Sequence, residues 1–343
     1  MTRRSSIACL LLSITLLAAA CGDGGEEAAQ VEPATGSLTV YSGRSEELVR
    51  PLIEQFESES GIDVQVRYGD TAQMAGAILE EGDNSPADVY YGQDAGALGA
   101  LSEEGRLQTL DQAVLDRVDA QFRSIDGQWV GVSGRARVAV YNTSVLSEDD
   151  LPESILDFTD PRWGGGKIGW APTNGSFQAF VTALRVSEGE DGARTWLEGI
   201  KANEPKVYDS NVPIVDAAGA GEIQVGFVNH YYLYRARAEN PDFPAANHIF
   251  PNGDLGSLVN VAGVGIVDTA PHDEEAQRFV DFLLSEPAQQ YFAAETFEIP
   301  LVDGVEPAAD LPPLESLQQP DINLNELADL QGTLDLMTEV GLI

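Results

Sequence analysis

Two adjacent tyrosines carry the most specific chemistry in this sequence. Tyr231 and Tyr232 follow the predicted strand Ile223–Asn229 after one residue, His230, near the start of the predicted helix His230–Glu239. Adjacent residues of a regular helix point about 100° apart, so the two phenols converge only in an irregular first turn. A helix N-terminus favours negative oxygen and would help both phenols to ionise. Paired phenolates would suit a hard trivalent cation; alternatively, the rings simply pack, one in the core and one on the surface.

A second group of residues could hold an anion. Asn174, Gly175 and Ser176 lie at the start of a helical pattern, where free N–H groups and hydroxyls can face a ligand. Asn211 lies in a similar Asp-Ser-Asn turn, and Asn229 ends the strand that precedes the tyrosines. For Asn174 and Ser176 the alternative is ordinary capping of the helix.

Strand and helix patterns that could position these residues alternate along the chain. The strand patterns cover residues 37–43, 64–68, 87–92, 129–142, 206–209, 223–229 and 258–268. The helix patterns cover residues 48–56, 71–81, 176–187, 192–202, 212–219, 230–239 and 324–340, with a further amphipathic stretch at 273–290. This order predicts a parallel sheet with helices on both faces, whose ligand crevice lies at the carboxyl ends of the strands. We expect residues 42–45 and 92–94 to line the crevice, and the long strand 129–142 to pass between two lobes.

Composition excludes several classes of function. The chain has 343 residues and a formal net charge of −37, which argues against binding to nucleic acid or to an anionic membrane surface. Both cysteines, Cys9 and Cys21, lie near the N-terminus, so the rest of the chain offers no disulfide, thiolate metal site or cysteine nucleophile. Neither a Gly-x-Ser-x-Gly nor a His-x-x-x-His motif is present. A hydrolase or lyase that works with paired carboxylates is the remaining enzymatic alternative.

The N-terminus has the pattern of an export signal. Arg3 and Arg4 precede an apolar run, Ile7–Ala20, that is too short to span a membrane comfortably. The small residues before Cys21 resemble a bacterial lipobox, which implies cleavage before Cys21 and a lipid on its sulfur. Residues 22–36 then form a tether, and the protein is anchored outside the cytoplasm. The alternative is an ordinary signal peptide that contains a cysteine.

Taken together, six segments resemble the bacterial ferric-iron-binding lipoproteins and periplasmic proteins that feed ABC importers. The segments are VYSGRSEE (40–47), SPADVYYGQDAGAL (85–98), SGRARVAVYNT (133–143), GWAPTNGSFQAFV (169–181), the turn 210–212 and GFVNHYYLYRA (226–236). The resemblance implies an α/β, two-lobe periplasmic-binding-protein-like fold with β-strand hinges and iron in a central cleft. It assigns the iron to Tyr231 and Tyr232, and a synergistic anion to Asn174, Gly175, Ser176, Asn211 and Asn229.

The sequence departs from this family at three positions. Ser45 stands where some members have a histidine, and Gln93, followed by Asp94, stands where the same members have a glutamate. Phe177 replaces an additional tyrosine of other members. Ser45, Gln93 and Asp94 are therefore possible further ligands or cleft residues, and so is His230, beside the tyrosine pair.

The charge of the cargo requires an anion. Fe³⁺ with two phenolates keeps a charge of +1, which is costly to enclose, so carbonate, phosphate or an organic chelator such as citrate should complete the shell. Arg44 could hold this anion with two hydrogen bonds, and Arg135 and Arg137 are further candidates on the predicted connecting strand.

These inferences define the expected protein. It captures ferric iron with a synergistic anion and delivers it to an ABC permease, without making or breaking bonds. We expect a monomer with a first lobe at residues 37–136 plus about 263–311, and a second at 137–262 plus about 312–343. The alternative function is binding of a ferric chelate or an organic anion in the same cleft.

Overall fold

The computed structural model describes residues 36–308, 311, 314 and 317–343. Its strands are β1 (Ser37–Ser42), β2 (Asp63–Tyr68), β3 (Val89–Gly92), β4 (Val130–Asn142), β5 (Ile168–Trp170), β6 (Lys206–Val207), β7 (Val225–Asn229), β8 (Ala245–His248), β9 (Val259–Ile266) and β10 (Ile299–Pro300). Its α-helices are α1 (Glu46–Ser60), α2 (Thr71–Glu81), α3 (Ala95–Glu103), α4 (Gln112–Leu115), α5 (Gly175–Ala202), α6 (Asn211–Gly219), α7 (Tyr231–Glu239), α8 (Asp273–Leu283), α9 (Glu286–Tyr291) and α10 (Leu330–Val340). The predicted signal segment, Cys21 and the tether up to residue 35 lie outside the described residues.

The strands form one mixed sheet in the order β2-β1-β3-β9-β4-β7-β5-β6, and β8 and β10 pair with β4. We refer to β2, β1, β3 and β9 as the first half of the sheet, and to β7, β5, β6 and β8 as the second half. The prediction of parallel pairing is confirmed for β1 with β2 and β3, and for β5 with β6 and β7. It is wrong in the middle, where β9 is antiparallel to β3 and β4, and β4 is antiparallel to β7. These middle strands pass from one half of the chain to the other instead of returning through a crossover helix.

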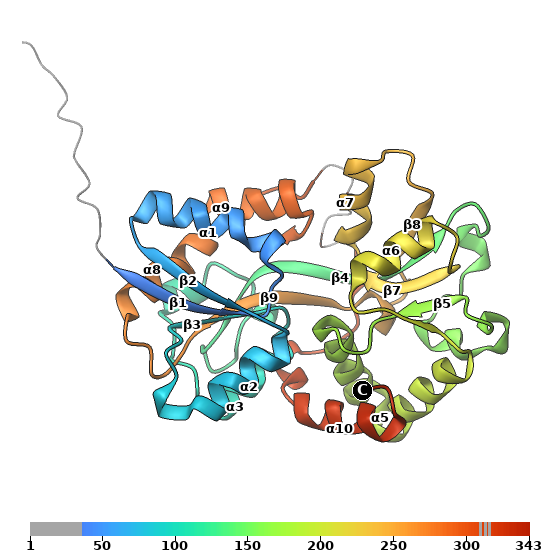
Figure 1. The fold of residues 1–343 in the computed structure, drawn as a ribbon, viewed down its shortest axis with the longest axis horizontal. Helices are drawn as coiled ribbons and strands as arrows, with labels where there is room; N and C mark the ends of the chain where they lie inside the picture. Colours follow the sequence, from blue (N-terminus) through green and yellow to red (C-terminus); the bar gives the residue numbers. More distant parts are fainter. Residues whose placement is uncertain (1–35, 309–310, 312–313, 315–316) are drawn as a thin grey trace, which may run out of the picture. The chain divides into compact units, whose positions relative to one another are not determined.

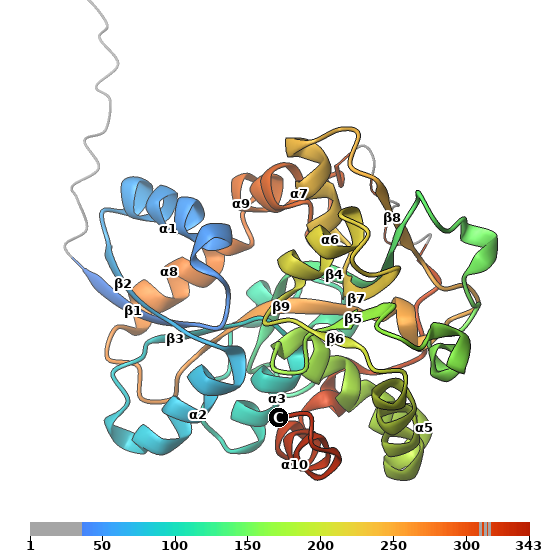
Figure 2. The same ribbon diagram turned by 45° about the vertical axis from the view of Figure 1, so that its right-hand side comes forward.

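The long strand β4 connects the two halves of the sheet, as its sequence predicts. Residues 130–136 pair with β9, whereas residues 137–142 pair with β7 and β8. All 13 residues of β4 are buried, including the polar residues Arg135, Arg137 and Asn142 that interrupt its apolar and small residues. The residues at its midpoint therefore lie where the two halves meet, and Figures 1 and 2 show β4 and β9 running through this region.

Helices cover both faces of each half of the sheet (Figure 1). In the first half, α1 and α8 lie on one face and α2 and α3 on the other. In the second half, α6 and α7 lie opposite α5 and α10 (Figure 2). The C-terminal segment contacts both halves, because Leu324–Leu327 packs on α3 and α10 packs on α5. Among the described residues, no helix has the length and apolar character required to cross a bilayer.

Several helices differ from what the sequence patterns predict. The patterns 176–187 and 192–202 belong to one helix, α5, which breaks at Gly189, where φ is 73°. The amphipathic stretch 273–290 is divided into α8 and α9, because Ser285 caps a new helix and Pro287 follows within its first turn. Helix α3 is absent from the predictions, since its small residues give little apolar periodicity.

Candidate functional site

The two tyrosines converge at the start of α7. Tyr231 is the first residue of this helix, one residue after the end of β7. Its ring lies 4.1 Å from that of Tyr232 between centroids, with 31° between the ring planes. Tyr231 is fully buried and Tyr232 is 8% exposed. The Tyr231 hydroxyl has no hydrogen-bond partner among the described residues. The two rings therefore lie side by side, and the pair presents an unsatisfied buried oxygen of the type that a hard cation binds.

Burial keeps the Tyr232 phenol protonated in the structure as it stands. Burial is the largest cause that raises its pKa well above the usual value, and the neighbouring Tyr231 raises it further. The positive charges of Arg44 and Arg135 act in the opposite direction. Tyr232 also lines a pocket of about 340 Å³ between α1, α6 and α7.

Three of the predicted anion residues, Asn174, Ser176 and Asn211, come together at the starts of α5 and α6. Asn174 caps α5, and its side-chain oxygen accepts hydrogen bonds from the Ser176 backbone N–H at 3.1 Å and the Ser176 hydroxyl at 2.6 Å. The side-chain amide of Asn211, at the start of α6, donates to the same oxygen at 3.2 Å. Asn229 is buried, and its Nδ2 has no partner within the described part of the chain. Two helix N-termini and this free donor could thus serve an anion.

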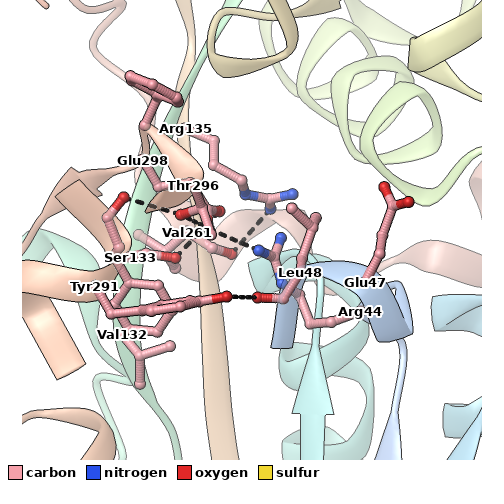
Figure 3. A network of polar contacts seen from close by, with 12 residues as sticks. Arg44, Glu47, Leu48, Val132, Ser133, Arg135, Val261, Tyr291, Thr296 and Glu298 are labelled. Carbon is pink, nitrogen blue, oxygen red and sulfur yellow. Dashed lines mark hydrogen bonds and ion pairs between the residues drawn. The ribbon is translucent and has the colours of Figure 1, made fainter. Parts of the chain in front are cut away.

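Two buried arginines approach the tyrosines from the first half of the sheet and from β4. Arg44 and Arg135 are each 1% exposed, and in both the Nε and Nη1 atoms lack partners among the described residues. Arg44 Nη2 donates to Glu298 at 2.7 Å, and Arg135 Nη2 donates to the Val261 carbonyl at 3.2 Å, as Figure 3 shows. Burial lowers the pKa of Arg44, but the charge of Glu298, followed by those of the tyrosines, raises it above the usual value. Burial and the charge of Arg44 lower the pKa of Arg135.

A third buried arginine, Arg137, lies beside Asn229 and Phe177. Arg137 pairs with Asn229 in the β4–β7 ladder, and its guanidinium carbon lies 5.4 Å from the ring centroid of Phe177. Burial lowers its pKa to about 9, so it remains charged at neutral pH. Its Nη2 donates to the Phe227 carbonyl at 3.3 Å. Phe177 itself packs edge-on against Trp170, so the position where other family members have a tyrosine belongs here to the core.

The remaining predicted ligands differ in exposure and in the hydrogen bonds that their side chains already form. Ser45 is exposed at the N-cap of α1 without a side-chain hydrogen bond to the helix, and Gln93 is half-buried. Asp94 is buried and caps α3 by accepting from the Ala97 N–H at 3.0 Å. His230 accepts from the Ala136 N–H through Nδ1 at 3.1 Å and lies 3.0 Å from the Phe297 carbonyl through Nε2. Both of its ring nitrogens are therefore engaged, which leaves His230 the least suited of the four to bind a metal.

The two halves touch around this site. A Cβ atom built on Gly175 would lie 3.1 Å from Thr71 Cβ and 3.2 Å from Asp94 Oδ2. Across the pocket beside Tyr232, Arg235 of α7 forms a 3.2 Å ion pair with Glu47 of α1. No cluster of three or more His, Cys, Asp and Glu side chains suited to a metal occurs in the described ranges. The phenols are therefore the candidate cation ligands that the geometry favours.

Glu298 is a site residue that no local sequence pattern indicates. It comes from the segment just before β10, about 250 positions from its partner Arg44. Its only sequence signal is a charged residue between Phe297 and Ile299, in a stretch that otherwise alternates as a buried strand.

Known proteins match the chain over most of its length. The family described as bacterial extracellular solute-binding protein matches residues 84–324. The Fe(3+)-binding periplasmic protein of Serratia marcescens is 31% identical over 322 residues, which cover 92% of this chain and 93% of that protein. Iron uptake protein A1 of Synechocystis sp. is 34% identical over 278 residues, which cover 78% of this chain and 76% of that protein.

Solved structures agree with this match. Iron-bound HitA from Pseudomonas aeruginosa superimposes with a TM-score of 0.85 at 34% identity, over 89% of this chain and 99% of that chain. The Trichodesmium protein IdiA (FutA) in complex with iron and citrate gives a TM-score of 0.75 at 29% identity, over 90% and 100% of the two chains. The predicted two-lobe periplasmic-binding-protein-like fold is thereby confirmed, while the residue boundaries of the lobes remain a prediction.

Proposed function

Since the chain belongs to the family of bacterial extracellular solute-binding proteins, we propose that it captures ferric iron with a synergistic anion and delivers the iron to an ABC permease. The observation that carries this proposal is the convergence of Tyr231 and Tyr232 at the start of α7, with an unpartnered buried hydroxyl. The names of the similar proteins from Serratia marcescens and Pseudomonas aeruginosa, which specify ferric iron binding and bound iron, support the identity of the cargo.

The two phenols would bind the iron by exchanging their protons for it. Before loading, burial holds the Tyr232 phenol in its neutral form, so the site gains its negative charge only as the cation arrives. Fe³⁺ is a hard acceptor that stabilises phenolate strongly, and the N-terminus of α7 favours the same charge. Of the other predicted ligands, Ser45, Gln93 and Asp94 could add oxygen donors as the halves close.

The buried charges specify the anion. Five buried charged side chains surround the site: Arg44, Arg135, Arg137, Asp94 and Glu298. They sum to +1, and Fe³⁺ with two phenolates adds another +1, so a dianion such as carbonate would make the closed assembly neutral. We propose that Arg44 holds this anion with its free Nε and Nη1, opposite the donors of Asn174, Gly175, Ser176, Asn211 and Asn229.

The remaining predictions complete the proposal. The protein would act outside the cytoplasm, held at the membrane by a lipid on Cys21, as a monomer that makes and breaks no covalent bonds. Iron binding would draw the two lobes together, and the closed form would dock on the permease.

Visible spectroscopy tests the proposal directly. Purified protein with ferric iron and carbonate should turn orange to red through phenolate-to-iron charge transfer. The double variant Tyr231→Phe, Tyr232→Phe should remain colourless. Tyr208→Phe is the matched control, because it also removes a hydroxyl that lacks a partner in the described structure, but one outside the site. A coloured double variant would exclude this site.

A second candidate cargo is a ferric chelate. It is favoured by the similarity to a structure with iron and citrate and by the pocket of about 340 Å³ beside Tyr232, which could admit an organic acid. Titration calorimetry with iron alone, citrate alone and ferric citrate would separate the two cargoes. Tight binding of metal-free citrate would favour the alternative in which the cleft takes an organic anion.

A further inference from the structure

Glu298 is a fully buried carboxylate at the junction of three chain segments. It accepts hydrogen bonds from Arg44 Nη2 at 2.7 Å, from the Thr296 hydroxyl at 2.9 Å and from the Ser133 hydroxyl at 3.2 Å. Figure 3 shows these donors converging on the carboxylate from the β1–α1 loop, from the segment before β10 and from β4. An unpaired carboxylate would be very costly at such a position, so Arg44 and Glu298 stabilise each other.

This arrangement fixes the orientation of the Arg44 guanidinium. Glu298 engages one of its terminal nitrogens, while Nε and Nη1 are left without partners among the described residues. The phenols of Tyr231 and Tyr232 lie close enough for their charges to act on Arg44. Glu298 thus holds the guanidinium so that two donors remain for the site.

Phe297, the residue before Glu298, contacts the start of α7 next to the tyrosine pair. The Phe297 carbonyl lies 3.0 Å from Nε2 of His230, the residue directly before Tyr231. Phe297 has a φ of 57°, which is costly for an aromatic residue and persists only where its surroundings require it. Because of this turn, two successive residues contact different partners. The Phe297 carbonyl lies beside His230 at the start of α7, and the Glu298 carboxylate binds Arg44.

We propose that Glu298 is a positioning residue that orients Arg44 and, by cancelling its charge, sets the charge of the anion that accompanies the cargo. This inference rests on the proposed function. When Glu298 is present, the five buried side chains together with Fe³⁺ and two phenolates carry a charge of +2, which matches a dianion. Without it they leave +3, which matches a trianion such as citrate.

The test compares two anions in the variant Glu298→Gln. Apparent iron affinity is measured at matched free ferric iron, with carbonate or citrate as the only added anion. Loss of the negative charge of Glu298 should raise the affinity about tenfold for each negative charge on the bound anion. Because citrate carries one negative charge more than carbonate, the citrate-to-carbonate affinity ratio should rise about tenfold. Glu298→Asp keeps the charge and should restore the wild-type ratio. Ser133→Ala is the matched control, since it removes one hydrogen bond to Glu298 without changing the charge.

Several results would overturn the inference. A merely structural role would weaken both affinities by one factor and leave the ratio unchanged. An equal shift in Glu298→Asp would show that charge is not the cause. If Glu298→Gln does not fold, the double variant Arg44→Gln, Glu298→Gln retains the net charge of the site; it should keep the wild-type ratio with weaker binding, and a changed ratio would contradict the inference. Failure of the proposed function is distinct, because the double tyrosine variant would then still be coloured.

Discussion

Gly175 offers a way to test whether the contact between the two halves persists when the cargo is bound. This residue opens α5 and faces Thr71 and Asp94 across the site. An added Cβ would lie 3.1 to 3.2 Å from those side chains, so they must give by a few tenths of an ångström. The variant Gly175→Ala therefore places one methyl group between the two halves without altering any polar donor.

The substitution should weaken iron binding and change the stability of the unloaded protein little. A displacement of about 1 Å can cost about 100-fold in a site that depends on geometry, so a few tenths should weaken iron binding about three- to tenfold. The backbone of Gly175 does not adopt a positive φ, so alanine gains about 0.4–1 kcal/mol through the unfolded chain, but its crowding against Thr71 and Asp94 costs about as much in the unloaded protein.

Competition with a chromophoric chelator measures the affinity, and urea unfolding measures the stability. Gly76→Ala is the control, because Gly76 lies in helix α2, with Thr71, and nothing lies within 4 Å of its added Cβ. It should stabilise the protein by about 0.4–1 kcal/mol and leave iron binding unchanged. If Gly175→Ala binds iron as tightly as Gly76→Ala, the contact seen here is not part of the loaded site.

Three further predictions follow from individual groups. Asp88→Ala should lower the free energy of unfolding by about 3 kcal/mol in urea titrations and leave the iron colour intact, because this fully buried carboxylate accepts from the Thr39 and His272 backbone N–H groups far from the tyrosines. Burial lowers the pKa of His230 to about 4, so its proton NMR signal should stay that of neutral imidazole down to that pH. Because the unfolded chain binds the proton first, stability should fall by about 3 kcal/mol between about pH 6.5 and 4, and less in His230→Gln. Iron loading without carbonate or phosphate should be at least about tenfold weaker and recover on adding carbonate, since the free donors of Arg44 then lack a counter-anion.

The elements that bring the site together could be predicted because local patterns determine them. The alternation in residues 129–142 and the helical spacing in 71–81 both match the observed β4 and α2. The direction of β9 could not be predicted, since an apolar run does not indicate whether its neighbour runs parallel or antiparallel. Helix α3 gave no periodic signal, yet its N-cap Asp94 is one of the buried charges of the site.

Within the site, the sequence could identify donors but not their partners. Tyr231, Asn174 and Asn211 stand out because each lies beside a predicted strand end or helix start, and such ends meet at one edge of a sheet. The Arg44–Glu298 pair joins residues 254 positions apart, and no local pattern connects them. The engagement of both His230 nitrogens by backbone groups likewise depends on the packing of β4 and of Phe297.

The balance of buried charge suggests why iron and anion should bind together. Before loading, three arginines and two acids leave the site with +1, and this charge favours an anion over a cation as the first ligand. Iron alone would raise the enclosed charge to +2 even after both phenols lose their protons, which makes closure around it costly. A dianion removes that penalty and uses the free nitrogens of Arg44 and Arg135. Each ligand should therefore increase the affinity for the other by the same factor, because coupling between two binding equilibria is reciprocal.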